Sequence, residues 1–386
     1  MLAATASVER AVARGSLYLS RSLDGDGGAP SAWLSWDACF RDRFTGGQAR
    51  AVLRERFGAD PGFDLGDEVF TAMVALVLLP SAVTSAHSEL EARLSRQIES
   101  ARWQRRYRFF SAANGFPADT DCTGLAVSAL HERGLLAAGD LQEHVADLLR
   151  AAAPAPGSVP RSSAHGDEGR LPPRVLMVYW DDGLEPATAP RGRRLDAVVC
   201  ANALYAVKLC ASPLTEDAQA AVAATTHYLA GHVESGRYLE GTRYYPSPDA
   251  FLYAASRLCA RFPHDFRDLA GHLRMAFLHR EASAPSSRLA TAPGTALDLA
   301  LRILTADRLG LAEGQEERRT LLAAVQQNDG SWPACAYYRM GRFPVYFGSP
   351  YLTTVFTLAA LRTREDRPLG QAPTVPGLRL SMSTEG

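Results

Sequence analysis

The chain has 386 residues, and 47% of them are hydrophobic, which is enough to bury the core of one large domain or two small ones. Its formal net charge is -1, so no overall field would attract nucleic acid or an anionic membrane surface. Composition and charge therefore argue against a nucleic-acid partner.

The N-terminal segment, Met1 to Ser20, is predicted to be an amphipathic helix, and it lacks the apolar core of a signal peptide. The longest apolar run, Phe70 to Val83, is shorter than the roughly 20 residues that a membrane-spanning helix needs. None of the six cysteines has zinc-ligand spacing. We therefore expect a cytoplasmic protein without a transmembrane segment. Lys208 is the only lysine, which is typical of a GC-rich bacterial genome, and the oligomeric state is left open.

One kind of segment recurs along the chain, in which a turn is followed by a helix that is apolar on all sides. These segments begin at Asp67, Asp121, Asp196, Asp249, Gly294 and Ser349. Helices with one charged face alternate with them, over Ser88–Arg106, Leu141–Ala152, Thr215–Val233, Asp265–Arg280 and Glu313–Gln326. A helix that is apolar all round must be buried all round, whereas a helix with a charged face lies outside. We therefore predict six inner and six outer helices, with the first helices of the chain as the last outer partner.

The predicted fold is an all-α (α/α)6 barrel in a single domain, residues 1–386, with its core at about 64–364. An open α-solenoid is the alternative, but the terminal hairpins lack the polar caps that a solenoid needs. The segment 151–194 is rich in Pro, Gly, Ser and Arg, and we expect it to be an insertion that covers the barrel mouth as a lid. The segment 365–386 is predicted to be a flexible tail.

The chain after the last polar helix reads Gln326-Gln327-Asn328-Asp329-Gly330-Ser331-Trp332. This segment resembles the Gln-Trp repeat of squalene-hopene cyclases, oxidosqualene cyclases and protein prenyltransferases. In such a repeat Gln326 would cap helix ends, and Trp332 would stack over the turn that Gly330 permits. The resemblance implies a structural motif that ties the outer helices together and takes no part in chemistry.

The start of the second apolar helix reads Asp119-Thr120-Asp121-Cys122-Thr123. It resembles the Asp-x-Asp-Asp-Thr segment of class II terpene cyclases, whose middle Asp protonates an alkene or epoxide. It also resembles the Asp-Cys-Thr segment of oxidosqualene cyclases, in which the Cys supports the acid. Both resemblances imply that Asp121 is the acid. They also imply that Asp119 orients Asp121 or polarises a water, and that Cys122 supports the acid.

Protonating a carbon–carbon double bond requires a strong acid that keeps its proton until the substrate is bound. Burial would hold Asp121 in the protonated form by raising its pKa. Hydrogen bonds and the helix N-terminus would stabilise the carboxylate that remains after the transfer. The alternative interpretation is that Asp119 and Asp121 only cap the helix.

A carbocation also needs a dry pocket lined by aromatic faces. Asn202 is a polar residue in an otherwise apolar helix, so we expect it to contact substrate or the neighbours of Asp121, although a buried amide can equally bond the backbone. We expect Asp121, Asn202, Tyr244 and Tyr245 to line one cavity. The residues predicted to contact substrate are Thr123, Trp180, Asn202, Tyr205, Tyr244, Tyr245, Phe251, Tyr346, Phe347 and Tyr351. Further aromatic candidates are Phe70, Tyr253, Tyr337, Tyr338 and Phe356.

The segment Asp181-Asp182-Gly183-Leu184-Glu185 has the Asp-Asp-x-x-Glu pattern with which class I terpene synthases bind magnesium and diphosphate. Gly183 and Pro186 favour a solvated loop here, so no metal site is predicted. Protonation requires no cofactor, and Mg²⁺ would be involved only if the substrate is a diphosphate. Two arginine clusters could hold a diphosphate, but a solvated outer face is favoured for both. They are Arg102, Arg105, Arg106 and Arg108, and Arg191, Arg193 and Arg194.

The leading hypothesis is an enzyme that cyclises or isomerises a linear isoprenoid, initiated by a proton from Asp121. Its partner would be a hydrophobic small molecule, an isoprenoid or another polyene. Protein prenyltransferases share the predicted barrel, but Asp121 and Cys122 are adjacent and do not form their Asp-x-Cys zinc motif. The alternatives are a tailoring cyclase or dehydratase of a non-terpenoid polyene, and a non-catalytic lipid-binding barrel.

Overall fold

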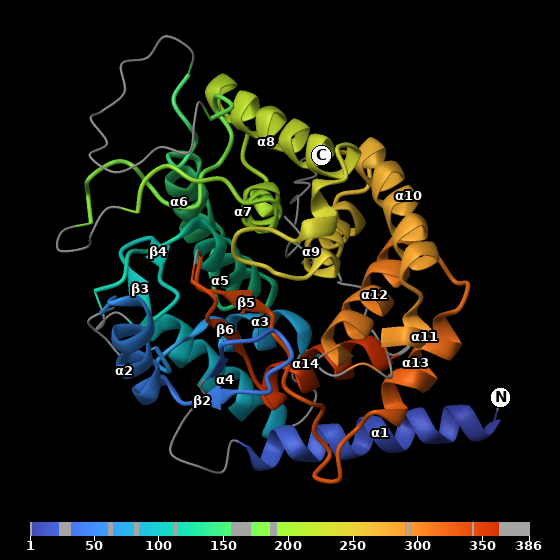
Figure 1. The fold of residues 1–386 in the computed structure, drawn as a ribbon. Coiled ribbons are helices and arrows are strands. Elements are labelled where there is room, and N and C mark those ends of the chain that lie inside the picture. Colours follow the sequence, from blue (N-terminus) through green and yellow to red (C-terminus); the bar gives the residue numbers. More distant parts are fainter. Residues whose placement is uncertain are drawn as a thin grey trace, which may run out of the picture.

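Six helices form an inner ring in the computed structural model, and each contacts the next around the ring (Figure 1). They are α3 (Phe70–Leu78), α5 (Thr120–Glu132), α7 (Ala197–Leu209), α9 (Pro248–Arg261), α12 (Ala296–Leu309) and α14 (Pro350–Leu361). Helix α14 also contacts α3, which closes the ring. The structure describes residues 2–22, 32–60, 65–80, 85–111, 115–155, 171–185, 191–289, 292, 295–341 and 343–362.

A second layer of helices surrounds this ring, and each outer helix contacts an inner one. The outer helices are α1 (Leu2–Arg21), α4 (Ser85–Ser100), α6 (Ala138–Leu149), α8 (Glu216–Glu234), α10 (Arg267–Ser283) and α13 (Gln315–Ala324). Helix α1 packs against α13 and α14, so the N-terminal helix completes the outer layer. The predicted (α/α)6 barrel is confirmed, and the ring is closed rather than an open solenoid.

The inner helices owe their position to sequences without a polar face. Every residue of α14 is buried, and α7 is buried from Ala197 to Val207. Their first turns are capped by side chains: Asp196 accepts the backbone N–H of Val198 at 3.0 Å, and Ser349 accepts that of Leu352 at 3.0 Å. Capping satisfies backbone donors that would otherwise be buried without partners.

Short strands, which the helical pattern does not predict, form an antiparallel four-stranded sheet in the order β2-β1-β6-β5. The strands are β1 (Trp33–Ser35), β2 (Arg43–Phe44), β5 (Tyr338–Arg339) and β6 (Tyr346–Gly348). Gly348 is required for this packing, because a Cβ there would lie 1.9 Å from the carbonyl oxygen of Cys335. The sheet ties the chain between α1 and α2 to the connection that precedes α14.

The helix predicted to run to Arg106 ends earlier, at Ser100. The chain then forms a two-stranded hairpin from β3 (Arg102–Trp103) and β4 (Arg106–Tyr107). Gln104 adopts a left-handed conformation with φ of 53°, which turns the chain back and is incompatible with a continuing helix. The remaining elements are α2 (Gly46–Phe57), α11 (Ser286–Leu289) and the 3-10 helix η2 (Arg237–Glu240).

The segment that resembles a Gln-Trp repeat joins three helices. The Gln326 side chain donates to the carbonyl oxygens of Ala11 in α1 and of Gly330, both at 2.9 Å. The fully buried Trp332 donates its indole N–H to the carbonyl oxygen of Leu322 in α13, at 2.7 Å. Its backbone N–H donates to Thr354 in α14 at 3.1 Å. The contacts made by this segment are therefore structural and lie far from Asp121 in the chain.

The predicted insertion at 151–194 is described in part. Residues 171–185 pass across the start of α5, where Thr120 donates its backbone N–H to the carbonyl oxygen of Val178 at 2.9 Å. Residues 156–170 and 186–190, and the predicted tail at 365–386, lie outside the described residues. The lid therefore stays a prediction. Among the helices that the structure describes, none is both long and apolar enough to cross a bilayer.

Candidate active site

The first turn of α5 carries the two carboxyl groups of the predicted site. Asp119 is the N-cap residue, and its side chain accepts the backbone N–H of Cys122 at 2.7 Å. Asp121 is the second residue of the helix, and its side-chain oxygens accept from Asn202 and Tyr245 rather than from a backbone N–H of the first turn. Capping therefore explains Asp119 but does not explain Asp121.

Asp121 is held by two neutral donors from other parts of the barrel. Asn202, in α7, donates its side-chain N–H to one oxygen of Asp121 at 2.8 Å. Tyr245, just before α9, donates its hydroxyl to the other oxygen. All three side chains are buried, and Asp121 is only 3% exposed. The structure thus brings together three of the residues that the sequence analysis selects.

Gly124 sets the distance between the helices that carry this contact. A Cβ at Gly124 would lie 2.8 Å from the carbonyl oxygen of Asn202 and 3.0 Å from the Cα of Ala203. No other residue type would let α5 and α7 approach so closely at this point. The close approach places the Asn202 amide beside Asp121, one turn before Gly124.

The carboxyl groups at the start of α5 are strongly perturbed. Burial, together with the nearby charge of Asp119, raises the pKa of Asp121 to about 8. The hydrogen bonds from Tyr245 and Asn202 oppose this rise, because they stabilise the carboxylate. Burial likewise raises the pKa of Asp119 to about 7. Asp121 is therefore largely protonated at neutral pH, and yet the groups that would stabilise its carboxylate are already in place.

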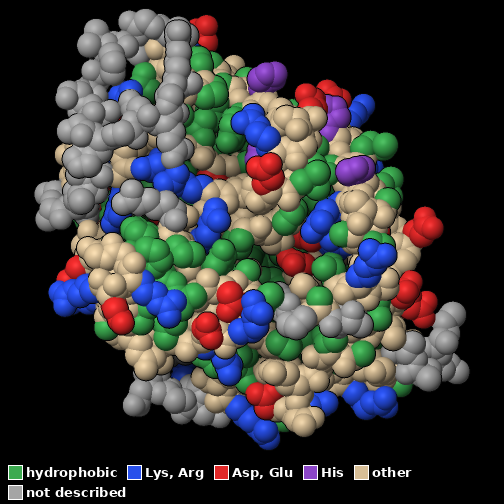
Figure 2. Space-filling model, viewed as in Figure 1, with side chains coloured by type: hydrophobic (Ala, Val, Ile, Leu, Met, Phe, Trp, Pro, Cys, Tyr) green, Lys and Arg blue, Asp and Glu red, His purple; other side chains and the backbone are tan. Residues whose placement is uncertain are grey.

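Tyrosine and phenylalanine rings surround the Asp121 contact. Tyr245 packs edge-on against Tyr337 and Tyr338, with ring centroids 5.3 and 5.7 Å apart. Tyr337 lies 4.9 Å from Phe356 of α14, which lies 5.5 Å from Tyr253 of α9. Because α9 and α14 are separated by α12 in the ring, the Tyr253–Phe356 contact crosses the barrel interior. In the same view as Figure 1, Figure 2 shows hydrophobic side chains near the middle of this face.

Other predicted residues lie close to this cluster. Tyr244 stacks on Tyr338 at 5.8 Å, and its backbone N–H donates to Asp196, the N-cap residue of α7. Phe347, in β6, packs against Tyr338 with the ring centroids 5.8 Å apart. Tyr346 precedes it in the same strand and is half-buried. That these side chains and Asp121 line one cavity stays a prediction.

Several predicted residues make contacts elsewhere. Cys122 is buried beside Asp119, its neighbour in the cap, and Thr123 accepts the backbone N–H of Tyr107 at 2.9 Å. Trp180 donates to the carbonyl oxygen of Asp147 in α6. Phe251 packs on His232 of outer helix α8 at 4.8 Å. The contacts of these four side chains hold structural elements together.

Two further aromatic residues predicted to bind substrate make contacts away from Asp121. Tyr205 donates its hydroxyl to Glu132, the last residue of α5, at the opposite end of that helix from Asp121. The Tyr351 hydroxyl has no hydrogen-bond partner among the described residues, and its electrostatic neighbour is Tyr18 of outer helix α1. Direct substrate contact by either residue remains a prediction.

The Asp-Asp-x-x-Glu loop pairs with arginines. Asp182 accepts from Arg106, which also bonds Asp147 at 2.6 Å. Glu185 accepts from Arg108 at 2.7 Å, and Asp181 accepts from Arg193 at 2.8 Å. Among the described residues, no group of three or more His, Cys, Asp or Glu side chains is arranged to hold a metal ion. Ion pairing therefore accounts for this loop and for Arg106, Arg108 and Arg193 of the two arginine clusters.

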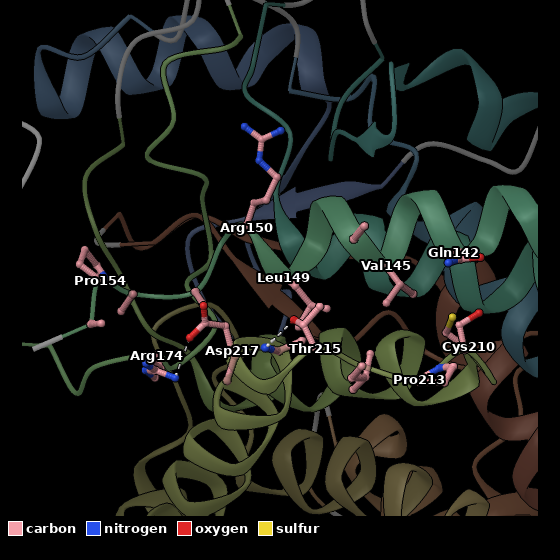
Figure 3. A pocket seen from close by; sticks show the side chains of 18 residues that line it. Gln142, Val145, Leu149, Arg150, Pro154, Arg174, Cys210, Pro213, Thr215 and Asp217 are labelled. Atoms are coloured by element: carbon pink, nitrogen blue, oxygen red, sulfur yellow. Dashed lines mark hydrogen bonds and ion pairs between the residues drawn. The ribbon is translucent and has the colours of Figure 1, made fainter. Parts of the chain in front are cut away.

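A separate groove lies on the outside of the barrel (Figure 3). Its volume is about 530 Å³, and it lies between α6, the start of α8 and their neighbouring loops. At one end Arg174 points toward Asp217, and their charged atoms are 3.1 Å apart. None of the residues predicted for the site lines this groove, so it is distinct from the surroundings of Asp121.

Sequence reasoning missed two charged residues in the barrel interior. Arg257 in α9 is 6% exposed, and Arg308 near the end of α12 is half-buried. Arg257 lies in the apolar helix that follows Asp249, and Arg308 lies near the end of the next one. A charged residue inside a helix that is otherwise buried was the available signal.

Comparisons with known proteins agree with this architecture. A structure of the type II terpene cyclase MstE from Scytonema, in complex with geranylgeranyl dihydroxybenzoate as substrate, superposes with a TM-score of 0.59. The alignment covers 94% of this chain and 98% of that chain at 10% sequence identity. A protein from Actinoplanes gives a TM-score of 0.54 at 16% identity, covering 92% of this chain and 98% of that one. The chain has the fold of the type II terpene cyclases.

Sequence comparison reaches a relative over part of the chain. Drimenol cyclase drtB from Aspergillus calidoustus is 30% identical over 181 residues, which are 47% of this chain and 31% of that protein. The match thus spans less than a third of that relative. No protein-family model matches the chain.

Proposed function

We propose that the protein is a type II-like terpene cyclase that cyclises or isomerises a linear isoprenoid, with Asp121 as the general acid. The observation that carries this proposal is the environment of Asp121, a buried carboxyl with a raised pKa whose hydrogen-bond partners among the described residues are the neutral donors Asn202 and Tyr245. The fold shared with MstE and the partial match to a drimenol cyclase support the same reaction class.

In the proposed first step, the carboxyl proton of Asp121 moves to one carbon of a substrate double bond. The π electrons form the new C–H bond and leave a carbocation on the neighbouring carbon, while the O–H electrons stay on Asp121 as a carboxylate. Asn202 and Tyr245 donate to that carboxylate from positions they already occupy, so little reorganisation is needed. Further double bonds then close the rings, and loss of a proton or addition of water ends the reaction.

Asp119 has a positioning role in this scheme. Its side chain caps α5 through Cys122, which fixes the backbone that carries Asp121. Its charge, when present, raises the pKa of Asp121. The aromatic rings of Tyr337, Phe356 and Tyr253 would stabilise positive charge along the interior. The reaction needs no metal, and Mg²⁺ would enter only with a diphosphate substrate.

The test is turnover of isoprenoid substrates by wild type and Asp121→Asn. Purified protein would be incubated with farnesyl diphosphate and with geranylgeranyl diphosphate, and the extracts analysed by mass spectrometry. Cyclic product from wild type and none from the folded variant is the expected result. Product formation by Asp121→Asn at the wild-type rate would refute the proposal. Turnover of non-terpenoid polyenes alone would favour the tailoring enzyme, and binding without turnover would favour a lipid-binding barrel.

A further inference from the structure

The hydroxyl group that bonds Asp121 is carried by a short loop between η2 and α9, residues 241–247, here called the Tyr245 loop. The backbone N–H of Thr242 donates to the carbonyl oxygen of Tyr245 at 2.7 Å, and the N–H of Tyr245 donates to the Thr242 hydroxyl at 3.1 Å. Gly241 has a φ of 71°, and a Cβ there would lie 2.4 Å from the carbonyl oxygen of Pro246. The loop is therefore a tight turn whose two ends touch.

Arg339 of β5 holds one side of the Tyr245 loop. Its guanidinium donates to the carbonyl oxygen of Arg243 at 3.1 and 3.0 Å and to that of Thr242 at 3.1 Å. Its backbone N–H donates to the carbonyl oxygen of Tyr244 at 2.7 Å. A guanidinium is a planar fork of donors, so several bonds from one side chain fix both the distance and the direction of the loop backbone.

Asp298, the third residue of α12, holds the other end of the loop. Ser247, the N-cap residue of α9, donates its hydroxyl to the Asp298 side chain. The same Ser247 oxygen accepts the backbone N–H of Asp249 at 3.2 Å. Because Ser247 accepts on one side and donates on the other, the point where the loop enters α9 is bonded to the neighbouring inner helix.

We propose that Arg339 and Asp298 are positioning residues of the acid site, which keep the Tyr245 hydroxyl against Asp121 by holding the Tyr245 loop from two sides. The inference rests on the proposed function and adds to it residues that lie outside the hydrogen bonds of Asp121. Asp196 also accepts from this loop, through the backbone N–H of Tyr244 at 3.2 Å. Its charge acts on the pKa of Asp121 as well, so Arg339 and Asp298 are the better residues to test.

The position of the hydroxyl matters because a hydrogen bond between two oxygens forms only over a narrow range, about 2.5–3.0 Å. A displacement of the loop by about 1 Å would take Tyr245 out of that range. The Asp121 carboxylate would then lose one of its two donors, and the proton would be harder to release. Tyr245 thus acts directly on the acid, and Arg339 and Asp298 act through Tyr245.

The pKa of Asp121 tests this proposal without any substrate. It would be measured by infrared titration of the carboxyl band in folded variants. Tyr245→Phe should raise this pKa by about one pH unit. Asp298→Ala and Arg339→Met should each raise it by about half a unit and add no further rise in Tyr245→Phe protein. For the proposed reaction, kcat should fall about three- to tenfold in each single variant, while KM changes less than about twofold.

The Tyr245→Phe background separates positioning from a direct effect of charge. Losing the negative charge of Asp298 would by itself lower the pKa of Asp121, and losing the positive charge of Arg339 would by itself raise it. Either direct effect would persist without the Tyr245 hydroxyl, whereas a positioning effect disappears with it.

Conservative variants provide matched controls. Asp298→Asn keeps an oxygen that can accept from Ser247, so the pKa of Asp121 should stay close to its wild-type value. Arg339→Lys keeps the charge without the paired donors and should restore only part of the effect. Ser349→Ala removes the N-cap side chain of α14 and should leave the pKa of Asp121 unchanged.

An unchanged pKa of Asp121 in folded Asp298→Ala and Arg339→Met, or a rise that persists in the Tyr245→Phe background, would overturn the proposal. Turnover that depends on Asp121, with a pKa that ignores Asp298 and Arg339, would leave the proposed function standing and refute this inference. If the pKa values change as expected but no isoprenoid is turned over, the proposed function fails and the positioning of Tyr245 stands.

Discussion

Two aspartates occupy the same position in two inner helices, and their surroundings differ completely. Asp121 is the second residue of α5, and Asp249 is the second residue of α9. Both are buried, with 3% and 1% of their surface exposed. Asp249 lies 3.0 Å from the guanidinium of Arg302 and 3.5 Å from that of Arg280. In the part of the chain that the structure describes, the Asp121 side chain accepts hydrogen bonds from the neutral donors Asn202 and Tyr245, and Asp119 lies close by.

The difference teaches that the partner, and not the position or the burial, decides what a buried carboxyl group can do. An arginine partner stabilises the carboxylate and makes Asp249 part of an ion pair between inner helices α9 and α12. Neutral donors leave burial as the dominant influence at Asp121, so its pKa rises to about 8. One aspartate is therefore suited to hold the barrel together, and the other to give up a proton.

The largest expected effect is on activity in Asp121→Asn. The amide keeps the size and the hydrogen-bonding capacity of the side chain but has no proton of comparable acidity to donate. We expect the turnover rate to fall by at least about 10³-fold while the protein remains folded. The measurement is product formation per enzyme with a prenyl diphosphate, alongside circular dichroism. A loss of similar size in folded Asp249→Asn would remove the distinction between the two aspartates.

The next effect is on stability in Asp249→Asn. This change leaves the buried Arg302 without its closest carboxylate, so we expect the free energy of unfolding to fall by about 2–4 kcal/mol. Activity of the fraction that remains folded should change little. Chemical denaturation at neutral pH measures the free energy of unfolding, and assays well below the unfolding temperature measure the activity. An unchanged unfolding midpoint would show that the ion pair contributes nothing.

Asp121→Asn should have the opposite effect on stability. The unfolded chain releases the Asp121 proton near its ordinary pKa of 3.8, whereas the folded protein keeps it until about pH 8. Retaining that proton costs stability as the pH rises from 3.8 to 8, and the variant has no such cost. We expect a gain on the order of 1–3 kcal/mol at pH 7.5 that vanishes near pH 4. Equal gains at both pH values would contradict the raised pKa.

Tyr245→Phe should shift the pH dependence of the reaction. The Tyr245 hydroxyl lowers the pKa of Asp121 against the effect of burial, so its removal raises that pKa further and weakens the acid. The rate at its plateau should fall about tenfold, and the loss of activity at high pH should move to higher pH. Tyr244→Phe is the control, because the Tyr244 ring stacks on Tyr338 rather than contacting Asp121. A shift to lower pH would be inconsistent with the proposed role.

The smallest expected effect is in Asp119→Asn. An amide can still cap α5 through its oxygen, and the change removes a negative charge that raises the pKa of Asp121. We expect a fewfold loss in rate, with loss of activity beginning at lower pH than in wild type. Measuring the turnover rate of wild type and Asp119→Asn as a function of pH checks both expectations. A loss as large as that of Asp121→Asn would make Asp119 the better candidate for the acid.

The sequence predicts the ring of helices well because each inner helix is apolar on every side and each outer helix has a charged face. Asp121, Asn202 and Tyr245 come from three successive repeats, from the first turn of α5, the second turn of α7 and the loop before α9, and these parts meet near one end of the barrel. The same uniform apolarity prevents prediction of which way each side chain of an inner helix points. Phe251 and Tyr205 lie on inner helices, yet one packs against outer helix α8 and the other lies at the opposite end from Asp121. No periodicity separates inward from outward faces when both are buried.

The hairpin before α5 could not be predicted either. Its short strands carry charges that continue the helical pattern of α4, so the sequence favours a longer helix. The backbone N–H of Tyr107, in this hairpin, donates to the Thr123 hydroxyl. That hydroxyl is therefore already engaged in a structural hydrogen bond. Tertiary packing, rather than local preference, determines this segment.

The protonation state of Asp121 tests the central claim most directly. Infrared difference spectra of protein with ¹³C-labelled aspartate, recorded from pH 5 to pH 10, would follow the C=O stretch of a protonated carboxyl group. Asp119 and Asp298, whose pKa values burial raises to about 7, contribute bands that disappear at lower pH. We predict a further component in wild type that disappears with a midpoint near pH 8, is absent in Asp121→Asn and is unchanged in Asp249→Asn. If Asp121→Asn removes no protonated-carboxyl band at pH 6, Asp121 is ionised in the resting protein and cannot be the acid that starts the reaction.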